Sequence, residues 1–231
     1  MLFWALFCGG CGVDTAGKGL MGGAESPEAY VELKAEVEAE RDSMAALYAA
    51  GGEEQVQAAK LLLRERLERD LIPSWYGTEW DFNGITETPR EGLIACGYFV
   101  STVLRDAGYR LERYKLAQQA SLHIVQSLSP SEYRKDWSGI EPDGLSDRMS
   151  EMAEGFYVVG LDNHVGFLLV DAEKEVWFLH SSYLDPGTVV REKARESAAL
   201  GTSNRYVVGF LESDWLVKKW LRGEKVVTVK G

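Results

Sequence analysis

Cysteine and histidine are both scarce in this chain, with three of each among 231 residues. Cys8 and Cys11 lie close to the N-terminus, so Cys96 is the only cysteine in the body of the chain. So few cysteines exclude a small fold that is held together by several disulfides. A lone thiol of this kind, particularly in an oxidising compartment, is typical of a residue that is kept for its reactivity.

Positive charge is in the minority, and long apolar runs are absent beyond the N-terminus. The chain has 25 Lys and Arg against 36 Asp and Glu, which gives a formal net charge of -11. An acidic surface repels phosphate backbones and no basic cluster offsets it, so we expect no nucleic-acid partner. No later segment reaches the roughly 20 consecutive apolar residues that span a bilayer. With 45% hydrophobic and 11% aromatic residues, the sequence predicts a globular fold with a sizeable core.

The N-terminus predicts export. Met1–Phe7 is a short apolar run, followed by Cys8, Cys11 and a glycine-rich stretch through Gly23. This order resembles the end of a secretory signal joined to a lipobox-like cysteine and a flexible tether. We therefore expect residues 1–23 to be a leader with lipid on Cys11 or Cys8, and the protein to be periplasmic or attached to the cell envelope. An ordinary frayed N-terminus is the alternative.

A pair of helices is expected next, in residues 24–71. Ser26 provides an N-cap, a proline takes the first helical position, and this helix ends at Gly51. A second helix, from about residue 53 to 70, has an apolar face that consists of Val56, Ala59, Leu63 and Leu67. The two helices are interpreted as an antiparallel pair, either packed on the following domain or spacing it from a membrane.

Residues 72–231 are expected to form a larger, catalytic domain. Its first part, up to Ile94, is irregular and rich in aromatic and turn-forming residues. A helix follows from about Cys96 to Gly108, where the glycine provides a C-cap. Another helix is expected around residues 115–128, and the sequence between it and the first strand resembles a loop.

From Gly155 onward the sequence changes to β-branched and aromatic runs separated by turn residues, which is the pattern of antiparallel strands. The expected strands cover residues 156–161, 164–170, 175–181, 188–191, 205–211 and, as a final edge strand, 225–230. One helix is expected between the fourth and fifth of these strands and another at residues 213–221. Because helices come first and the sheet second, the predicted fold class is α+β, with a helix-borne cysteine packed on an antiparallel sheet.

Cys96 and two histidines form a candidate catalytic group. A cysteine at a helix start lies beside unpaired N–H groups and the positive end of the helix dipole, which lower the pKa of its thiol. His164 and His180 are expected on neighbouring strands, nearly opposite each other across a turn. A thiol nucleophile, an imidazole base and a group that orients the base are the parts of a cysteine hydrolase. The N–H groups of Cys96 and Gly97 would line an oxyanion hole.

The motifs around these residues resemble those of the NlpC/P60 superfamily of papain-like cysteine peptidases. Residues 94–100 (IACGYFV) are similar to the D-C-S-G-F-type nucleophile motif of that family, and residues 163–167 (NHVGF) to its H-V-G-I-Y-type base strand. Ala95 and Gly97 stand where the family has Asp and Ser. His180 matches the polar residue, often histidine, that the family carries on the next strand.

The resemblance covers roughly residues 72–182 and implies a papain-like fold. It implies that Cys96 is the nucleophile, His164 the base and His180 the residue that orients the base. The implied reaction is cleavage of an amide bond in peptidoglycan stem peptides through a thioester, frequently at the link between D-Glu and a diamino acid. No metal or other cofactor is implied.

An aromatic segment before the cysteine also matches the family. Trp75-Tyr76-Gly77 resembles an aromatic-glycine segment that commonly carries a tyrosine beside the active site. The resemblance therefore makes Tyr76, together with Trp75, a candidate for contact with the oxyanion or the substrate.

Two further interpretations stay open. The same fold could be a catalytically inactive module that binds a cell-wall fragment through its tryptophan and tyrosine side chains. Alternatively, Cys96, His164 and His180 could bind zinc, although no closely spaced ligand pair such as H-x-x-x-H surrounds them. His123, in a predicted amphipathic helix without a partner in view, is interpreted as a structural residue.

Overall fold

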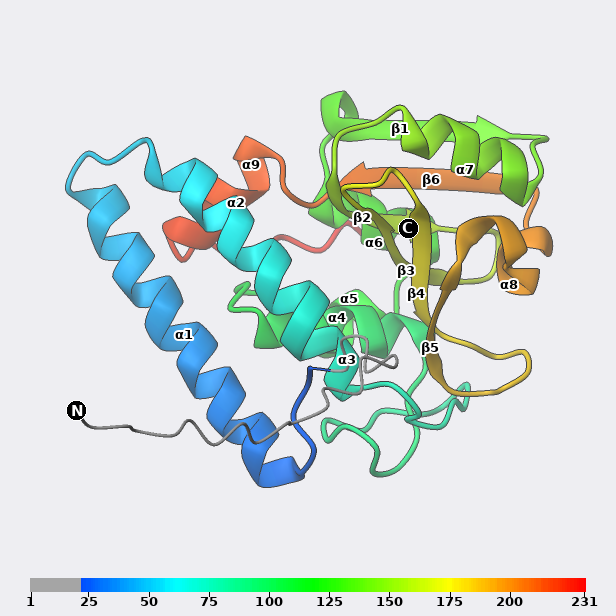
Figure 1. Ribbon diagram of the computed structural model, residues 1–231, viewed down its shortest axis with the longest axis horizontal. Coiled ribbons are helices and arrows are strands. Elements are labelled where there is room, and N and C mark those ends of the chain that lie inside the picture. The colour runs from blue at the N-terminus through cyan, green and yellow to red at the C-terminus, as the bar shows by residue number, and fades with distance from the viewer. Residues whose placement is uncertain (1–21) are drawn as a thin grey trace, which may run out of the picture.

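The computed structural model describes residues 22–231, and the predicted lipidation sites Cys8 and Cys11 lie outside these residues. Two long N-terminal helices lie on one side of the molecule and a sheet with its own helices lies on the other (Figure 1). Within the described residues, no helix combines the length and the apolar character that a membrane crossing needs.

Helix α1 (Pro27–Ala49) begins as its capping residue dictates. The Ser26 hydroxyl accepts a hydrogen bond from the Ala29 N–H at 3.2 Å, and a proline is the first helical residue. The chain turns at Gly51, where φ is +101°, a left-handed conformation that glycine adopts without strain. Helix α2 (Gln55–Glu65) then runs back along α1, which confirms the predicted antiparallel pair (Figure 1).

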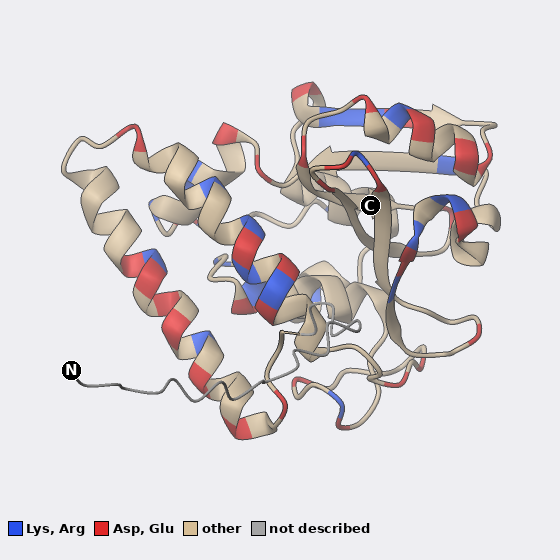
Figure 2. Ribbon diagram, viewed as in Figure 1, with Lys and Arg blue, Asp and Glu red and all other residues tan. Residues whose placement is uncertain are grey.

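The charged residues of this helix pair lie mainly toward solvent. Figure 2 shows acidic residues spaced along α1, and the side chains of Glu28, Glu32 and Glu36 are exposed. Solvated charges of this kind contribute little to stability. The apolar residues of the pair, such as Val56 and Leu63, instead pack into the core.

The N-terminal helices share one hydrophobic core with the rest of the chain. Tyr30 of α1 donates a hydrogen bond to the buried Asp106 at 2.9 Å and accepts one from Trp75 Nε1 at 2.9 Å. These bonds satisfy polar groups that burial would otherwise penalise. Of the two arrangements expected for the helix pair, the structure has the packed one.

Helix α4 is the central helix of the molecule. Phe99 and Val103 of α4 are fully buried, because the helix packs against the sheet on one side and against η1 on the other. A turn at residues 118–120 divides the helix expected at 115–128 into two short helices. The helices between α2 and the sheet are η1 (Arg66–Leu71, a π-helix), α3 (Ile72–Ser74), α4 (Cys96–Asp106), α5 (Arg113–Ala117) and α6 (Ser121–Leu128).

The sheet has six antiparallel strands in the order β1-β6-β2-β3-β4-β5, which confirms the α+β class. Strands β2 to β5 follow one another as a meander, and β6 returns to pair with β2 on its other side. The strands are β1 (Arg134–Ser138), β2 (Gly155–Gly160), β3 (Val165–Val170), β4 (Val176–Ser181), β5 (Val189–Lys193) and β6 (Arg205–Phe210).

Helices cover both faces of the sheet. On one face α4 and α6 pack against a core that includes Val165 and Phe167 of β3. On the other face α7 (Pro142–Ser150) and α8 (Ala198–Gly201) pack against a second core that includes Phe178 of β4. Because β2 and β3 are buried on both faces, their sequences are nearly continuous apolar runs.

The stretch after residue 128, which was expected to be a loop, contains three elements. These are η2 (Ser131–Tyr133), β1 and α7. Strand β1 has the sequence RKDWS and forms one edge of the sheet. It lacks the apolar alternation that identifies a strand, so its place in the sheet depends on pairing with β6.

The edge strand expected at residues 225–230 is not formed, and that prediction is wrong. The Val226 N–H donates to the Arg110 carbonyl at 2.8 Å, and the Val229 N–H donates to the Ser127 hydroxyl at 2.9 Å. The backbone of this segment therefore bonds to a loop and a helix rather than to a strand.

The helices expected before and after β6 are confirmed as η3 (Ala194–Glu196), α8 and α9 (Asp214–Leu221).

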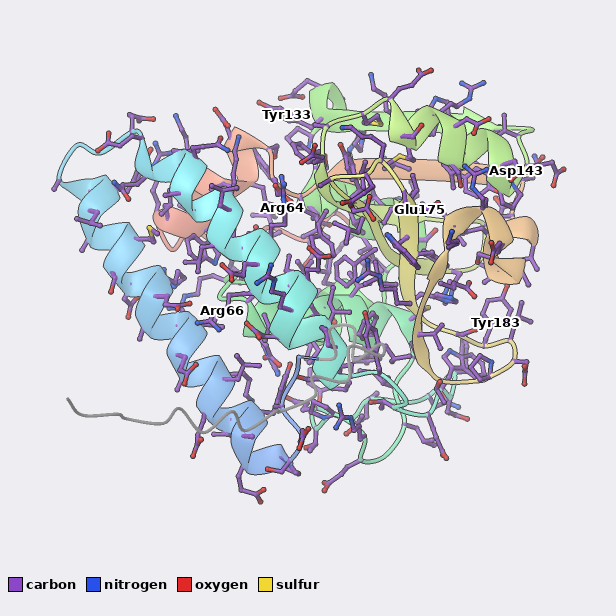
Figure 3. All side chains as sticks on the ribbon, in the orientation of Figure 1. Arg64, Arg66, Tyr133, Asp143, Glu175 and Tyr183 are labelled. Carbon is purple, nitrogen blue, oxygen red and sulfur yellow. The ribbon has the colours of Figure 1, made fainter. Side chains whose placement is uncertain are left out.

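An ion pair between the partly buried Arg64 and the buried Glu212 connects α2 to the sheet. Arg64 donates from Nη2 to Glu212 Oε2 at 2.7 Å, and the Phe156 N–H donates to Glu212 Oε1 at 2.8 Å. Figure 3 shows Arg64 between α2 and the sheet. Burial raises the pKa of Glu212, although the hydrogen bonds from Arg64 and Phe156 act to lower it. The carboxylate therefore depends on Arg64 for its charge balance.

Replacing Arg64 with methionine would leave the Glu212 carboxyl group, which is 3% exposed, without its counter-charge. We expect the free energy of unfolding to fall by about 3 kcal/mol near neutral pH. The loss should be smaller in mildly acidic solution, because the folded state raises the pKa of Glu212 and protonation removes the unpaired charge. Urea unfolding at both pH values measures this difference.

Arg69→Met is the matched control. Arg69 pairs with Glu65 at 3.6 Å, and both side chains are 60% exposed. Its replacement should change the free energy of unfolding by less than about 0.5 kcal/mol. Equal losses in the two variants would contradict the importance of burial at Arg64.

Candidate active site

Cys96 lies at the first position of α4, where the sequence predicted it. Ala95 is the extended N-cap residue, and no side chain of the described chain caps this helix. The Ala95 N–H donates to the Gly84 carbonyl at 2.9 Å, and the Ser181 hydroxyl of β4 donates to the Ile94 carbonyl at 2.7 Å. These bonds fix the approach to the helix and leave its first N–H groups for the thiol or for a bound oxyanion.

Burial dominates the electrostatics of the Cys96 thiol. It raises the pKa of the thiol above the ordinary value of 9.0, while the N–H groups of Val165, Gly97 and Cys96 act to lower it. The helix start therefore acts in the expected direction but is outweighed, and the prediction of a lowered thiol pKa is wrong. Near neutral pH the sulfur carries its proton, so attack on a substrate would require a base.

Gly97 is the point at which α4 meets α5. A Cβ atom added at Gly97 would collide with the carbonyl oxygen of Ala117, the last residue of α5. The close approach of the two backbones therefore requires glycine here. A serine side chain would not fit at this position.

His164 and His180 are in direct contact, as their expected positions on the hairpin predicted. His164 precedes β3, His180 lies near the end of β4, and His164 Nε2 is 2.8 Å from His180 Nδ1. They are 3% and 0% exposed. Burial lowers the pKa of His164 well below 6.5, and the charge of His180 lowers it further. Burial also lowers the pKa of His180, so both rings are neutral near pH 7.

Glu192 of β5 extends this pair into a chain of three side chains. Its Oε1 atom lies 3.2 Å from His180 Nε2. In the pairing of β4 with β5, Glu192 is opposite Phe178 and His180 is opposite Val190, so Glu192 and His180 are diagonal neighbours on one face. The sequence analysis did not identify Glu192. The only signal was its diagonal position relative to His180, which is known only once the register between β4 and β5 is known.

The cysteine and the imidazoles lie on opposite faces of the sheet. The His164 ring packs against Phe178, with centroids 6.1 Å apart, and Phe178 belongs to the core under α7 and α8. Cys96 packs with the core on the α4 face. The two groups approach each other at the start of β3, where the N–H of Val165 faces the sulfur. Within residues 22–231, no hydrogen bond joins the Cys96 thiol to the His164 imidazole.

The aromatic side chains of the Trp75-Tyr76-Gly77 segment before the cysteine are buried or half-buried. Trp75 is fully buried, with its ring 6.4 Å from that of Phe99, so the predicted contact with substrate is wrong for this residue. The Tyr76 hydroxyl is buried without a hydrogen-bond partner among the described residues. Burial raises the pKa of Tyr76 to about 12, and the nearby charge of Arg191 opposes that rise. Among the described residues, no hydrogen bond joins Tyr76 to Cys96.

Tyr183 lies beside His164, and Trp80 lies beside Tyr183. The ring of Tyr183 is 5.1 Å from that of His164 and 6.1 Å from that of Trp80, measured between centroids. Both aromatic side chains are half-buried. Tyr183 lies in the loop after β4 (Figure 3), and its hydroxyl shares a hydrogen bond with that of Thr202 at 2.8 Å. These rings form a partly exposed surface next to the candidate base.

A metal site does not form around these residues. In the part of the chain that the structure describes, no group of three His, Cys, Asp or Glu side chains is arranged to hold a metal ion. Cys96 and the two histidines lie on different faces of the sheet. The geometry therefore gives no support to the zinc interpretation.

Comparisons of this chain with protein-family models, with curated proteins and with solved structures find no match. The resemblance to the NlpC/P60 superfamily therefore rests on the motifs themselves. These are the cysteine at a helix start, the histidine before a strand and the second histidine on the next strand.

The reaction of Cys96 with iodoacetamide tests the effect of burial on the thiol. Because only the thiolate reacts and its pKa lies above 9.0, the rate should still be rising at pH 9. Mass spectrometry of the peptide that contains Cys96 gives the rate at each pH. The urea-unfolded chain is the reference and should react faster than the folded protein at pH 8. A plateau below pH 7 would instead indicate the activated thiolate that the helix start predicted.

Proposed function

We propose that this chain is a cysteine hydrolase, a divergent relative of the NlpC/P60 superfamily with a papain-like fold. The observation that carries the proposal is the buried pair of imidazoles, in which His164 Nε2 lies 2.8 Å from His180 Nδ1. His164 immediately precedes Val165, whose N–H faces the Cys96 sulfur. The order of elements also supports the proposal, because the cysteine begins a helix, and later in the chain one histidine precedes β3 and the other lies near the end of β4, its hairpin partner.

In the proposed reaction, the proton of the Cys96 thiol moves to His164 Nδ1 as the sulfur attacks the carbonyl carbon of an amide. The N–H groups of Cys96 and Gly97 stabilise the oxyanion. The C–N bond then breaks, the amine leaves with the proton from His164, and a thioester remains on Cys96. Water deprotonated by His164 hydrolyses the thioester and restores the thiol.

A general base is essential because both the Cys96 thiol and the His164 imidazole are uncharged before the substrate reacts. With the pKa of the thiol raised and that of His164 lowered, both by burial, thiolate formation must accompany attack rather than precede it. The sulfur and the imidazole must also approach each other around the start of β3. Hydrogen bonds in unliganded active sites are often loose and tighten when the substrate binds.

The proposed substrate is a peptide of the cell wall. The family resemblance implies peptidoglycan stem peptides, with the bond between D-Glu and a diamino acid as the frequent site of cleavage. An exported protein attached to the envelope through lipid on Cys11 would meet this substrate. Tyr183 beside His164, and Trp80 beside Tyr183, offer partly exposed rings on which such a peptide could lie. The reaction requires no metal or other cofactor.

Hydrolysis of a muropeptide tests the roles of the two principal residues. We expect Cys96→Ala to abolish release of the free amine, because no thioester can form. His164→Ala should lower kcat/KM by at least about 100-fold, the typical contribution of a general base. His123→Ala is the matched control and should retain the wild-type rate, because His123 lies outside the site. Chromatography of the cleaved peptides measures all four proteins.

The alternative function is that of an inactive module that binds a cell-wall fragment. The raised pKa of the thiol and the absence of a Cys96–His164 hydrogen bond among the described residues are the observations that favour this alternative. If the wild-type protein binds muropeptides but releases no amine, the hydrolase proposal is wrong. Isothermal titration with the same peptides distinguishes the two functions.

The acid limb of the pH profile provides a separate test of His164. The base must be neutral, and burial holds the pKa of His164 well below 6.5. The value of kcat/KM should therefore fall only below pH 6.5, as His164 takes up a proton. Rates measured in small pH steps locate this limb. An acid limb centred above 6.5 would contradict the assignment of a buried His164 as the base.

A further inference from the structure

The two buried imidazoles depend on one partly exposed carboxylate. His164 and His180 are 3% and 0% exposed, so water contributes little to their hydrogen bonding. Glu192, whose side chain is 34% exposed, is the outermost of three hydrogen-bonded side chains. Its Oε1 atom lies 3.2 Å from His180 Nε2. No hydrogen bond to His164 Nδ1 is formed within residues 22–231. Glu192 therefore determines which ring nitrogen of His180, and in turn of His164, carries the proton. We call this arrangement the proton order.

The chemistry of a carboxylate determines that order. An ionised carboxylate only accepts hydrogen bonds, so His180 must carry its proton on Nε2 to donate to Glu192. In neutral His180, Nδ1 is then unprotonated and accepts from His164 Nε2–H across the 2.8 Å contact. Neutral His164 consequently has an unprotonated Nδ1. Glu192 therefore leaves the lone pair on His164 Nδ1 free, and it acts through the His180 ring that lies between them.

We infer that Glu192 is a positioning residue, whose carboxylate orders the protons of His180 and His164 so that His164 Nδ1 is the free base. The use of that lone pair in catalysis rests on the proposed function. The proton order itself does not, because it follows from the hydrogen bonds alone.

The charge states of the three groups support this order. Burial acts to raise the pKa of Glu192, but hydrogen bonds from His180 and Ser197 outweigh it and leave the pKa below 4.5. Burial lowers the pKa of His180, although Glu192 opposes this. A doubly protonated His180 would donate through both nitrogens and would force the proton of His164 onto Nδ1. The neutral ring avoids that reversal.

The surroundings hold the chain in this geometry. The ring of Phe178 stacks on that of His180, with centroids 4.0 Å apart and an interplanar angle of 16°. Tyr183 packs against the His164 ring from the loop after β4. Glu192 is held by the pairing of β5 with β4. The imidazole planes are thus fixed by packing, and the carboxylate supplies the direction of the hydrogen bonds.

Nitrogen NMR of the full chain labelled with ¹⁵N-histidine tests the inference directly. Protonated and unprotonated ring nitrogens resonate in well-separated regions, and the chain has only three histidines. Near neutral pH we expect the His164 Nδ1 signal in the unprotonated region and the His164 Nε2 signal in the protonated region. His180 should show the same order. A wild-type His164 protonated on Nδ1 would overturn the inference.

Three variants show whether Glu192 is the cause. Glu192→Lys places a hydrogen-bond donor that cannot accept beside His180 Nε2. In both rings the proton should therefore move from Nε2 to Nδ1. Glu192→Gln keeps an acceptor oxygen and should retain the wild-type order. Glu192→Ala, which only removes the acceptor, should give a mixture of both orders and decides the question if the lysine variant does not fold. The wild-type order in Glu192→Ala would contradict the inference.

Glu196→Gln is the matched control, because it removes one exposed carboxylate close in sequence and should leave every histidine signal unchanged. The spectra require no turnover, so they separate this inference from the proposed function. An inactive protein with the expected proton order would contradict only the hydrolase proposal. An active protein with the reverse order would contradict only the role of Glu192.

Discussion

The packing of α4 between the sheet and the N-terminal helices is the constraint on which the other features depend. Phe99 of α4 contacts Trp75 on one side and Phe167 of β3 on the other, with ring centroids 6.4 and 5.8 Å apart. Close-packed side chains on both sides prevent the helix from sliding or rotating. This packing holds Cys96 at the start of β3 and Gly97 against α5.

The same packing removes water from the groups that would carry out chemistry. Burial raises the pKa of the Cys96 thiol and lowers that of both imidazoles, so the uncharged form of each group is favoured. A buried thiolate–imidazolium pair would carry a large desolvation cost. Two neutral imidazoles hydrogen-bonded to the partly exposed Glu192 carboxylate avoid this cost and still leave a basic nitrogen.

Directional polar contacts attach the N-terminal helices to this frame. Tyr30 bonds to Asp106 at the end of α4, and Arg64 bonds to Glu212 beside β6. Apolar burial favours contact without specifying one orientation, whereas a buried polar group is stable only where its partner lies. The helix pair is therefore part of the same packed body as the sheet and the candidate active site.

Local elements such as the helix that begins at Cys96 could be predicted from the sequence, and so could the contact of His164 with His180, because one hairpin places them opposite each other. Capping residues and β-branched runs act over a few neighbouring positions, so their effect does not depend on the fold. Three other features became visible in the folded protein alone: the strand formed by the polar segment β1, the addition of Glu192 and the face of the sheet on which the imidazoles lie. The folded protein also determines the direction of the Cys96 pKa shift. These features depend on register and burial, which arise when residues distant in the sequence pack together.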